Sequence, residues 1–190
     1  FVTATINQNK QKGPDEIKLA GRVTRAFLGV RIDCMQCHDD KFGDRWKQEH
    51  FHELASFFGS AEMSISGVRD KGKEPYRYTY LGADEETEVA PGVPFAGDLL
   101  PETGNARQRL AHWVTHAENE AFARSIVNRV WALMFGRPMI EPIDAIPVNG
   151  PWPAAMTVLA DDFRDQGYNL RRLIRIIAAT EAFQLDSRAP

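Results

Sequence analysis

Residues 15–38 read DEIKLAGRVTRAFLGVRIDCMQCH, and this stretch contains both cysteines of the chain. Alternating steps of four and three residues connect a mostly apolar stripe, a spacing typical of one face of a helix. The members of the stripe are Glu16, Ala20, Val23, Phe27, Val30, Cys34 and Cys37. Asp15, which follows Gly13 and Pro14, is a typical helix start. We therefore expect one helix from about Asp15 to Cys37, with both cysteines on its core-facing side.

The end of this stretch, Cys34-Met35-Gln36-Cys37-His38, has the C-x-x-C-H spacing of covalent haem attachment. Residues i and i+3 share one face of a helix or tight turn, so two thiols can bond the two vinyl groups along one porphyrin edge. His38 can then bind the iron as its proximal ligand. The sequence predicts haem c, with Cys34, Cys37 and His38 as cofactor-binding residues and His38 as the iron ligand.

Paired cysteines at this spacing have other uses. A thioredoxin-like redox motif would lie in a βαβ pattern, which this sequence does not show. A structural zinc site needs four ligands. His50 or His52 would have to complete Cys34, Cys37 and His38, and the adjacent Cys37 and His38 would close one tetrahedron awkwardly. A disulfide is the simplest alternative, although cysteines at i and i+3 bridge poorly inside a regular helix. Disulfide and non-haem metal therefore remain open beside haem.

Several further side chains are candidate metal ligands. Met63 follows the second predicted helix and would raise the reduction potential as a sixth ligand of the iron, but packing is the interpretation we favour. His50 and His52 flank an apolar helix face, which predicts boundary or surface positions. His112 and His116 have the i, i+4 spacing of a metal pair. Because no third ligand or carboxylate base accompanies them, we expect a surface pair.

Helical periodicity and cap signals predict two helical blocks around an irregular middle region. The expected helices after the first are residues 47–58, a helix beginning at Asn105, a helix capped by Asn119 and closed by Gly136 and Pro138, residues 154–166 and residues 169–182. Residues 76–80 are interpreted as a short strand, and residues 89–95 as an edge strand or extended loop. The predicted fold class is mainly α, with a small irregular β/loop insertion between the helical blocks.

Composition and length limit the possible functions. The 190 residues form one large domain or two small ones, and 43% are apolar, as in ordinary globular proteins. A net charge of −3 provides no basic field for nucleic acid. No apolar run approaches the about 18 residues that span a membrane. Since the chain begins at Phe1 without an initiator Met or signal peptide, we expect a processed chain or a piece of a longer polypeptide.

Charged residues of the second block have structural interpretations. Arg129 and Arg137 could bind haem propionates or connect the two blocks, but we favour structural ion pairs. Asp161 and Asp162 are adjacent on a predicted helix and point in different directions, which indicates solvated charges rather than acid–base chemistry. The last helix carries three arginines mostly off its apolar face, which we interpret as a solvated side rather than a contact with an anionic surface. They are Arg171, Arg172 and Arg175.

Two parts of the chain carry several motifs in a fixed order. In residues 19–58 they are Thr24-Arg25-Ala26-Phe27-Leu28-Gly29-Val30, the C-x-x-C-H segment, Trp46-Lys47-Gln48 and Leu54-Ala55-Ser56-Phe57-Phe58. In residues 107–187 they are Phe122-Ala123-Arg124, Asn128-Arg129-Val130-Trp131-Ala132, Phe135-Gly136-Arg137, Asp162-Phe163, Gly167-Tyr168, Leu173-Ile174-Arg175 and Phe183-Gln184-Leu185. On these motifs the sequence resembles the cytochrome-c-like domain families of planctomycetes and related bacteria. There a C-x-x-C-H domain precedes a helical domain of unknown function.

This resemblance implies three parts: a cytochrome-c-like helical part in residues 1–60, a connector in residues 61–104 and the associated helical domain in residues 105–190. It also implies a periplasmic or otherwise exported protein, and a haem-binding electron-transfer module with an unidentified redox partner. A structural or assembly module, and part of an exported redox or hydrolytic enzyme, are the alternatives. Asp40 stands where many family members have a second His, and residues 151–153 read Pro-Trp-Pro instead of Ser-His-Pro.

Overall fold

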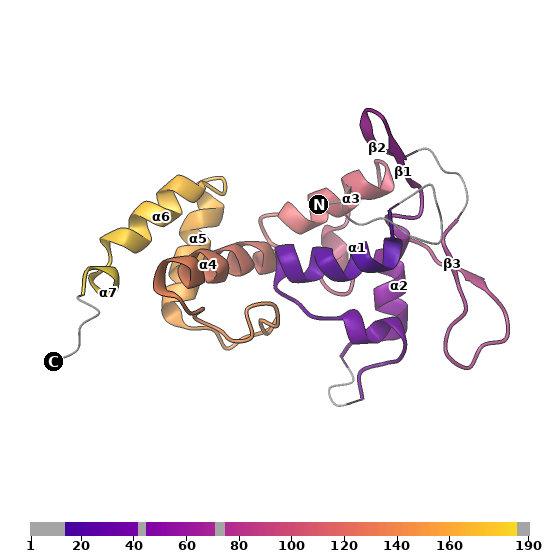
Figure 1. Cartoon of the computed structure of the whole chain (residues 1–190), viewed down its shortest axis with the longest axis horizontal. Coiled ribbons are helices and arrows are strands. Elements are labelled where there is room, and N and C mark those ends of the chain that lie inside the picture. Colours follow the sequence, from indigo (N-terminus) through magenta and orange to yellow (C-terminus); the bar gives the residue numbers. More distant parts are fainter. Residues whose placement is uncertain (1–13, 42–44, 71–74, 186–190) are drawn as a thin grey trace. The chain divides into compact units, whose positions relative to one another are not determined.

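The computed structural model describes residues 14–41, 45–70 and 75–185 (Figure 1). Helices dominate, and two small antiparallel sheets accompany them, which confirms the predicted mainly α fold class with a small β insertion. The contacts within the chain divide it into two compact units. Unit 1 comprises residues 1–25 and 31–116, and unit 2 comprises residues 26–30 and 117–190.

Helix α1, Glu16–Val23, begins unit 1 as expected. Asp15 is its N-cap residue, and the Asp15 carboxylate accepts a hydrogen bond from the Lys18 N–H at 3.0 Å. One face of the helix is buried, through Leu19, Ala20 and Val23. The stripe that we expected to face the core therefore does so over this first part of the segment.

The helix does not continue to Cys37, and that expectation is wrong. A π-helical turn, Thr24–Leu28, follows α1, and Gly29 then adopts a left-handed conformation with φ of +63°. The chain resumes helical geometry only in a 3₁₀ helix, Asp33–Gln36. Because the helix is interrupted before the cysteines, the residues of the predicted stripe no longer lie on one helix face beyond Gly29.

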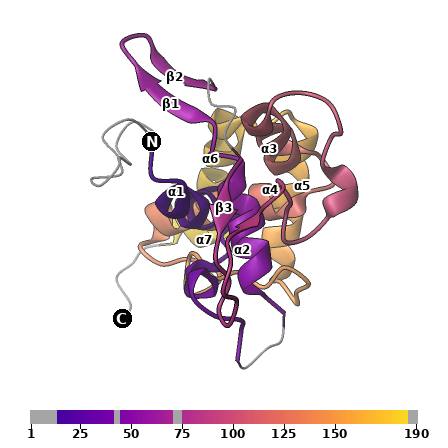
Figure 2. The same cartoon turned by 90° about the vertical axis from the view of Figure 1, so that its right-hand side faces the viewer.

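Helix α2, Gln48–Ser56, confirms the second predicted helix, with ends one or two residues shorter than expected. Its apolar face is buried through Phe51, Leu54 and Ala55. The helix packs against both α1 and the 3₁₀ helix (Figure 2). α2 is therefore the element of unit 1 that supports the cysteine-bearing turn.

The middle region forms two short hairpins. β1, Ala61–Ser64, pairs with β2, Gly67–Asp70, and the turn of this hairpin points away from α1 and α2 in both Figure 1 and Figure 2. β3, Arg77–Tyr78, pairs with β4, Thr87–Glu88, so that Arg77 lies opposite Glu88 and Tyr78 opposite Thr87. The strand expected over residues 76–80 is shortened to β3, Arg77–Tyr78, and its partner β4 is Thr87–Glu88. Residues 89–95 form the extended loop that was one of the two expectations.

Helix α3, Ala106–Thr115, belongs by its contacts to unit 1, although the sequence interpretation grouped it with the C-terminal domain. Asn105 caps it as expected, since its side chain accepts a hydrogen bond from the Gln108 N–H at 2.9 Å. The Arg107 guanidinium binds both carboxylate oxygens of Asp70, at 2.6 and 3.1 Å. This bidentate pair connects α3 to the first hairpin. A 3₁₀ turn, Gly97–Leu99, precedes the helix.

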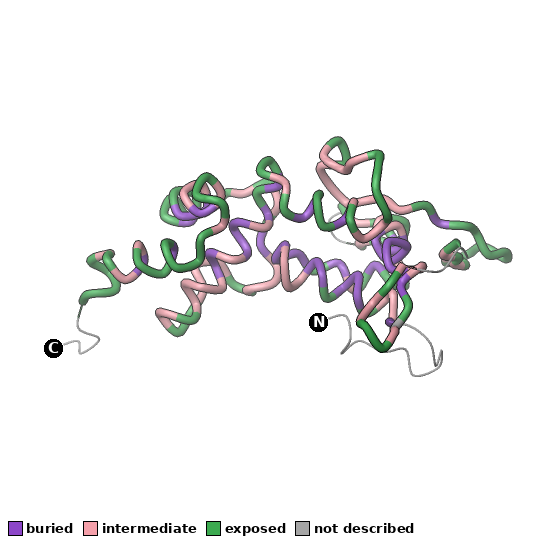
Figure 3. The backbone as a smooth tube through the Cα atoms, turned by 90° about the horizontal axis from the view of Figure 1, so that it is seen from above, coloured by how far each residue is buried: buried purple, intermediate pink, exposed green. Residues whose placement is uncertain are grey.

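Unit 2 is built on three helices and a short fourth. They are α4, Glu120–Phe135; α5, Ala154–Asp165; α6, Leu170–Ala179; and α7, Glu181–Gln184. The predicted last helix is divided at Thr180, whose side chain caps α7. α4, α5 and α6 share one core, formed by Ala123, Val127, Leu159, Ala160, Phe163, Leu173 and Ile177. Most other residues of α6 and α7 are exposed (Figure 3). None of the helices in the described residues has the length and apolar character to cross a bilayer.

The long connection between α4 and α5 is held by a buried asparagine. Asn128 on α4 is fully buried, and its amide nitrogen donates to the Ile140 carbonyl at 2.9 Å. Its amide oxygen accepts from the Ile140 N–H at 3.1 Å. Asn128 thus pairs with both main-chain groups of one residue, as a strand would.

We predict that Asn128→Ala lowers the free energy of unfolding of the protein by about 2 kcal/mol, because both main-chain groups of Ile140 lose their partner. Chemical denaturation monitored by circular dichroism measures the change. Asn149→Ala removes an exposed asparagine of the same connection and is the matched control, expected within about 0.5 kcal/mol of the parent. Equal stabilities for the two variants would contradict the role given to Asn128.

Candidate cofactor-attachment site

The C-x-x-C-H segment begins in the 3₁₀ helix and ends just after it. The Cys37 N–H donates to the Cys34 carbonyl at 3.3 Å, so the two cysteines open and close one turn. Both thiols are exposed and unpaired, whereas Met35 is 7% exposed and takes the inward position. The expectation that the cysteines face the core is therefore wrong. With three residues per turn, i and i+3 lie on the same side, and here that side faces solvent.

The start of this turn is connected to the preceding helix. The Arg25 Nε donates to an Asp33 carboxylate oxygen at 2.6 Å. Gly21 on α1 lies under the same carboxylate, and a Cβ at position 21 would collide with the Asp33 Oδ1. A Cβ at position 21 would displace this carboxylate, so glycine gives the Asp33 side chain room to lie against α1.

The middle of the turn is held through one main-chain carbonyl. The Gln36 oxygen accepts hydrogen bonds from three side chains, at distances of 3.1 to 3.2 Å. The donors are Gln48 Nε2, His52 Nε2 and the Tyr78 hydroxyl. A carbonyl oxygen has two lone pairs, so this acceptor is fully used. Two donors come from α2 and one from β3, and together they fix the peptide that joins the two halves of the cysteine turn.

His52 lies behind the cysteine turn and was misplaced by the sequence interpretation, which predicted a boundary or surface position. The side chain is fully buried and its ring stacks on Tyr78, with centroids 3.4 Å apart. Nε2 donates to the Gln36 carbonyl, which leaves Nδ1 to accept from the Tyr76 hydroxyl at 2.8 Å. Burial lowers the pKa of His52, against the opposing effect of the hydrogen bond to Gln36. The neutral ring is therefore the native form.

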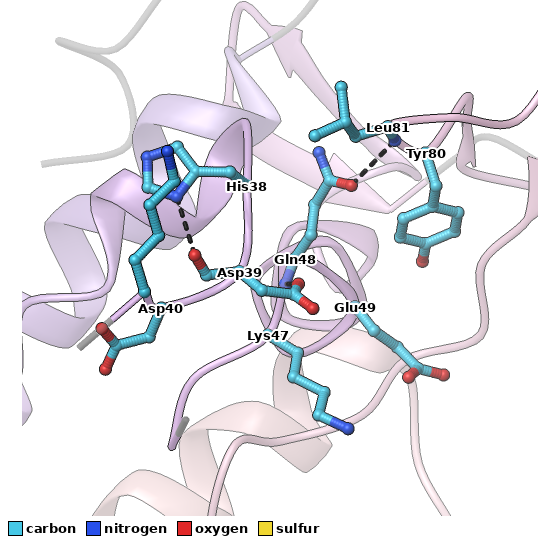
Figure 4. A pocket seen from close by; sticks show the side chains of 9 residues that line it. His38, Asp39, Asp40, Lys47, Gln48, Glu49, Tyr80 and Leu81 are labelled. Carbon is cyan, nitrogen blue, oxygen red and sulfur yellow. Dashed lines mark hydrogen bonds between the residues drawn. The ribbon is translucent and has the colours of Figure 1, made fainter. Parts of the chain in front are cut away.

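Gln48 connects three segments at the start of α2 (Figure 4). Its main-chain N–H donates to the Asp39 carboxylate at 2.7 Å, so Asp39 caps the helix. Its side-chain oxygen accepts from the Leu81 N–H at 3.0 Å, in the connection between β3 and β4. Gln36, two residues before His38, and Asp39, directly after it, are thus both hydrogen-bonded to Gln48 at the same helix end.

His38 has the ring arrangement of a metal-binding histidine. Its Nδ1 lies 2.8 Å from the Asp39 carbonyl oxygen, and only Nδ1–H can donate to that acceptor (Figure 4). The lone pair then belongs to Nε2, and the hydrogen bond sets both the tautomer and the ring orientation. Two exposed thiols on one turn and an oriented imidazole next to them are the donor groups that covalent haem requires.

The groove beside His38 has a volume of about 480 Å³, and most of the residues that line it are of polar or charged type. Besides His38, the lining residues are Asp39, Asp40, Lys41, Lys47, Gln48, Glu49, Tyr80 and Leu81. Tyr80 and Leu81 contribute an aromatic ring and an aliphatic side chain to it. The donor chemistry therefore fits haem, and the groove combines apolar surface with several charged side chains.

The other candidate ligands are placed differently. His50 Nδ1 accepts the Lys47 N–H at 3.2 Å and so belongs to the start of α2. Both ring nitrogens of His52 are engaged, so His52 cannot complete a zinc site. The rings of His112 and His116 lie 5.5 Å apart. In the described parts of the chain, no group of three or more His, Cys, Asp or Glu residues could hold a metal ion. The side chain of Met63 lies outside the described residues.

Among the arginines, the structure gives the clearest role to one that the sequence interpretation missed. Arg124 is 6% exposed, forms an ion pair with Glu120, and its guanidinium lies 3.3 Å from the ring centroid of Trp152. Burial lowers its pKa to about 10. The Trp152 ring, in the connection before α5, therefore stacks on a buried cation.

The remaining charged candidates are structural or exposed. Asp162 binds Arg172 through both carboxylate oxygens, and this hydrogen bonding lowers the pKa of Asp162. Asp162 and Arg172 therefore form an ion pair, in place of the separately solvated charges we expected. Arg171, Arg175 and Arg137 are exposed.

We predict that the protein loses stability as the pH falls below the ordinary His pKa of 6.5. The lowered pKa of His52 means that the unfolded chain binds the proton first. The contribution of His52 to the free energy of unfolding is therefore fully present above pH 6.5. It is lost as the pH falls from 6.5 through the lowered pKa of His52. Denaturation between pH 5 and pH 8 measures it. His52→Gln should weaken this dependence, and His112→Gln, at an exposed position, should keep it. Identical pH profiles for both variants would contradict the assignment.

Family models match both ends of the chain. Residues 2–63 match PSCyt2, a protein of unknown function (DUF1549), and residues 106–190 match PSD1, a protein of unknown function (DUF1553). No curated protein and no solved structure matches the chain. Each family match covers less than half of the sequence. The chain is thus similar, in this order, to two planctomycete-associated domains of unknown function.

Proposed function

We propose that Cys34, Cys37 and His38 attach haem c and that the protein is an electron-transfer module. The observation that carries the proposal is the joint arrangement of these residues. Two exposed thiols stand on one 3₁₀ turn, and the next residue is an imidazole whose Nδ1 is held by the Asp39 carbonyl. A disulfide or a thioredoxin-like motif gives no reason for an oriented histidine directly after the second cysteine.

Each residue has a separate task in this proposal. The two thiols would add across the vinyl groups of the haem to form thioethers, and His38 would present Nε2 to the iron. The Asp39 carbonyl keeps the His38 proton on Nδ1, which makes Nε2 the better electron donor. When bound, haem supplies an iron that cycles between two oxidation states. The three hydrogen bonds to the Gln36 carbonyl hold the turn, so little rearrangement of the chain would accompany a change in the oxidation state of the iron.

The polar setting favours a low reduction potential. The groove beside His38 contains Asp39, Asp40 and Glu49 and is open to water. Water and carboxylates stabilise the more positively charged ferric state, and burial is one of the means by which a protein raises a haem potential. We therefore expect this module to act as a reductant toward its partner, a redox protein yet to be identified.

An exported location belongs to the same proposal. Covalent attachment requires a maturation system outside the cytoplasm, and the resemblance to exported planctomycete proteins supports that setting. The similarity of residues 106–190 to a second domain of unknown function supports a place within a larger polypeptide.

One observation favours a second candidate, a structural or assembly module without haem. Charged side chains line much of the groove beside His38, which a porphyrin face does not favour, and the cysteine turn is already held by hydrogen bonds within the protein. In that case Cys34 and Cys37 would serve as free thiols or as a disulfide. Attachment of haem in the exported protein separates the two candidates.

We predict one covalently attached haem per chain when the protein is exported from cells that contain a cytochrome c maturation system. Intact mass and a pyridine haemochrome spectrum measure the attachment. Cys34→Ala/Cys37→Ala should abolish it, and the exposed His112→Ala control should retain it. His38→Ala tests ligation separately, because any haem that remains attached should have an altered spectrum. A folded parent protein without haem would reject the proposal and favour the structural module.

A further inference from the structure

Unit 2 contains a second groove, of about 440 Å³, that has no role in the proposed haem site. It lies between the second half of α4, the connection after α4, and the first turn of α5. Its lining residues are Trp131, Phe135, Arg137, Pro138, Met139, Pro153 and Ala155. Pockets of this size, mainly apolar and with few polar groups, are where small ligands bind in proteins.

Two aromatic rings form one wall of this α4–α5 groove. The rings of Trp131 and Phe135 stack with centroids 4.1 Å apart and planes inclined by 22°. Phe183 meets Phe135 edge-on at 5.5 Å, which holds the Phe135 ring from another direction. The wall is therefore built from rings whose orientation is set by their neighbours. Such a wall favours a flat apolar body that can lie along it.

The charge of the groove has one sign. Arg137 is exposed, and across the described residues its guanidinium forms no ion pair or hydrogen bond. No acidic residue lines the groove. Since a guanidinium is charged at all physiological pH values, this rim attracts an anionic group. Arg172, by contrast, is already bound to Asp162. The start of α5, whose first turn lacks a side-chain cap, adds a weaker field of the same sign.

We propose that the α4–α5 groove binds a small ligand with a planar apolar body and a single negative charge, such as an aromatic carboxylate or sulfonate. The body packs along Trp131 and Phe135, and the anionic group binds the guanidinium of Arg137. Met139 and the two prolines cover the remaining apolar surface of the ligand. This inference concerns unit 2 alone and does not depend on whether haem is attached to unit 1.

Two fluorescent probes that differ in one charged group test the inference. 8-Anilinonaphthalene-1-sulfonate carries a flat apolar naphthalene ring and one negative charge, and N-phenyl-1-naphthylamine is its neutral analogue. The anionic probe should bind the whole protein with one-to-one stoichiometry. Arg137→Gln should weaken its binding by about tenfold, the effect of one charge-assisted contact, and should change the affinity of the neutral probe by less than about twofold. Arg175→Gln, at an exposed position of α6, is the matched control and should change neither affinity.

A third variant tests whether the probes occupy this groove rather than another apolar patch. Ala155 is exposed and lines the groove, so Ala155→Phe fills the space without disturbing the core of unit 2. It should displace both probes. Retained binding in Ala155→Phe, an equal loss of both probes in Arg137→Gln, or no saturable binding by the parent protein would each overturn the inference. Circular dichroism of each variant verifies that the fold is intact.

Discussion

The Gln36 carbonyl accepts hydrogen bonds from three side chains, and the geometry of the cysteine turn depends on them. Two donors, Gln48 and His52, lie one helical turn apart on α2, and the third, Tyr78, comes from the short β3–β4 hairpin. These hydrogen bonds connect helix α2 and the β3–β4 hairpin to one main-chain carbonyl, which lies between Cys34 and Cys37 in the sequence. The turn can therefore hold its thiols in solvent without losing its shape. A flexible loop at this place would offer the same groups in many arrangements, and binding a cofactor would first have to order them.

Helix α2 also fixes the two residues that follow the cysteine turn, His38 and Asp39. Asp39 follows the turn, and it uses its side chain to cap α2 and its main-chain carbonyl to orient His38. The same helix end thus positions both the thiols and the imidazole. A substitution in α2, such as at His52, is expected to act on the proposed attachment site through the Gln36 peptide and not by direct contact. This places His52 and Gln48 among the positioning residues of the site.

Local signals predicted the helices well, because caps and periodicity act over a few residues. Asp15, Asn105 and Asn169 each cap the helix expected to start there. The end of the first helix was predicted wrongly. Its apolar spacing continues past Gly29, although the positive φ at that glycine ends the helical path. Periodicity alone does not register such a break, whereas an isolated glycine inside a helical pattern, here Gly29, is a signal that the helix can end there.

The site was only partly predictable for a related reason. The spacing of Cys34, Cys37 and His38 identifies the candidate donors, since attachment chemistry acts between neighbours in the chain. The burial of His52 depends on Tyr76 and Tyr78, which are more than twenty positions away, and no short-range pattern links them. The alternating tyrosines of residues 76–80 were the available hint, because a strand with aromatic residues on one side needs a partner for that face.

The measurement that tests the central claim most directly is the visible absorption spectrum of the exported protein, recorded oxidised and then reduced with dithionite. The account predicts an intense Soret band that shifts on reduction, together with the sharp α and β bands of a reduced c-type haem. These bands should persist after extraction with acidified organic solvent, because the thioether bonds to Cys34 and Cys37 are covalent. A spectrum with aromatic protein absorption alone, from correctly folded protein exported by cells that mature other c-type cytochromes, would contradict the account.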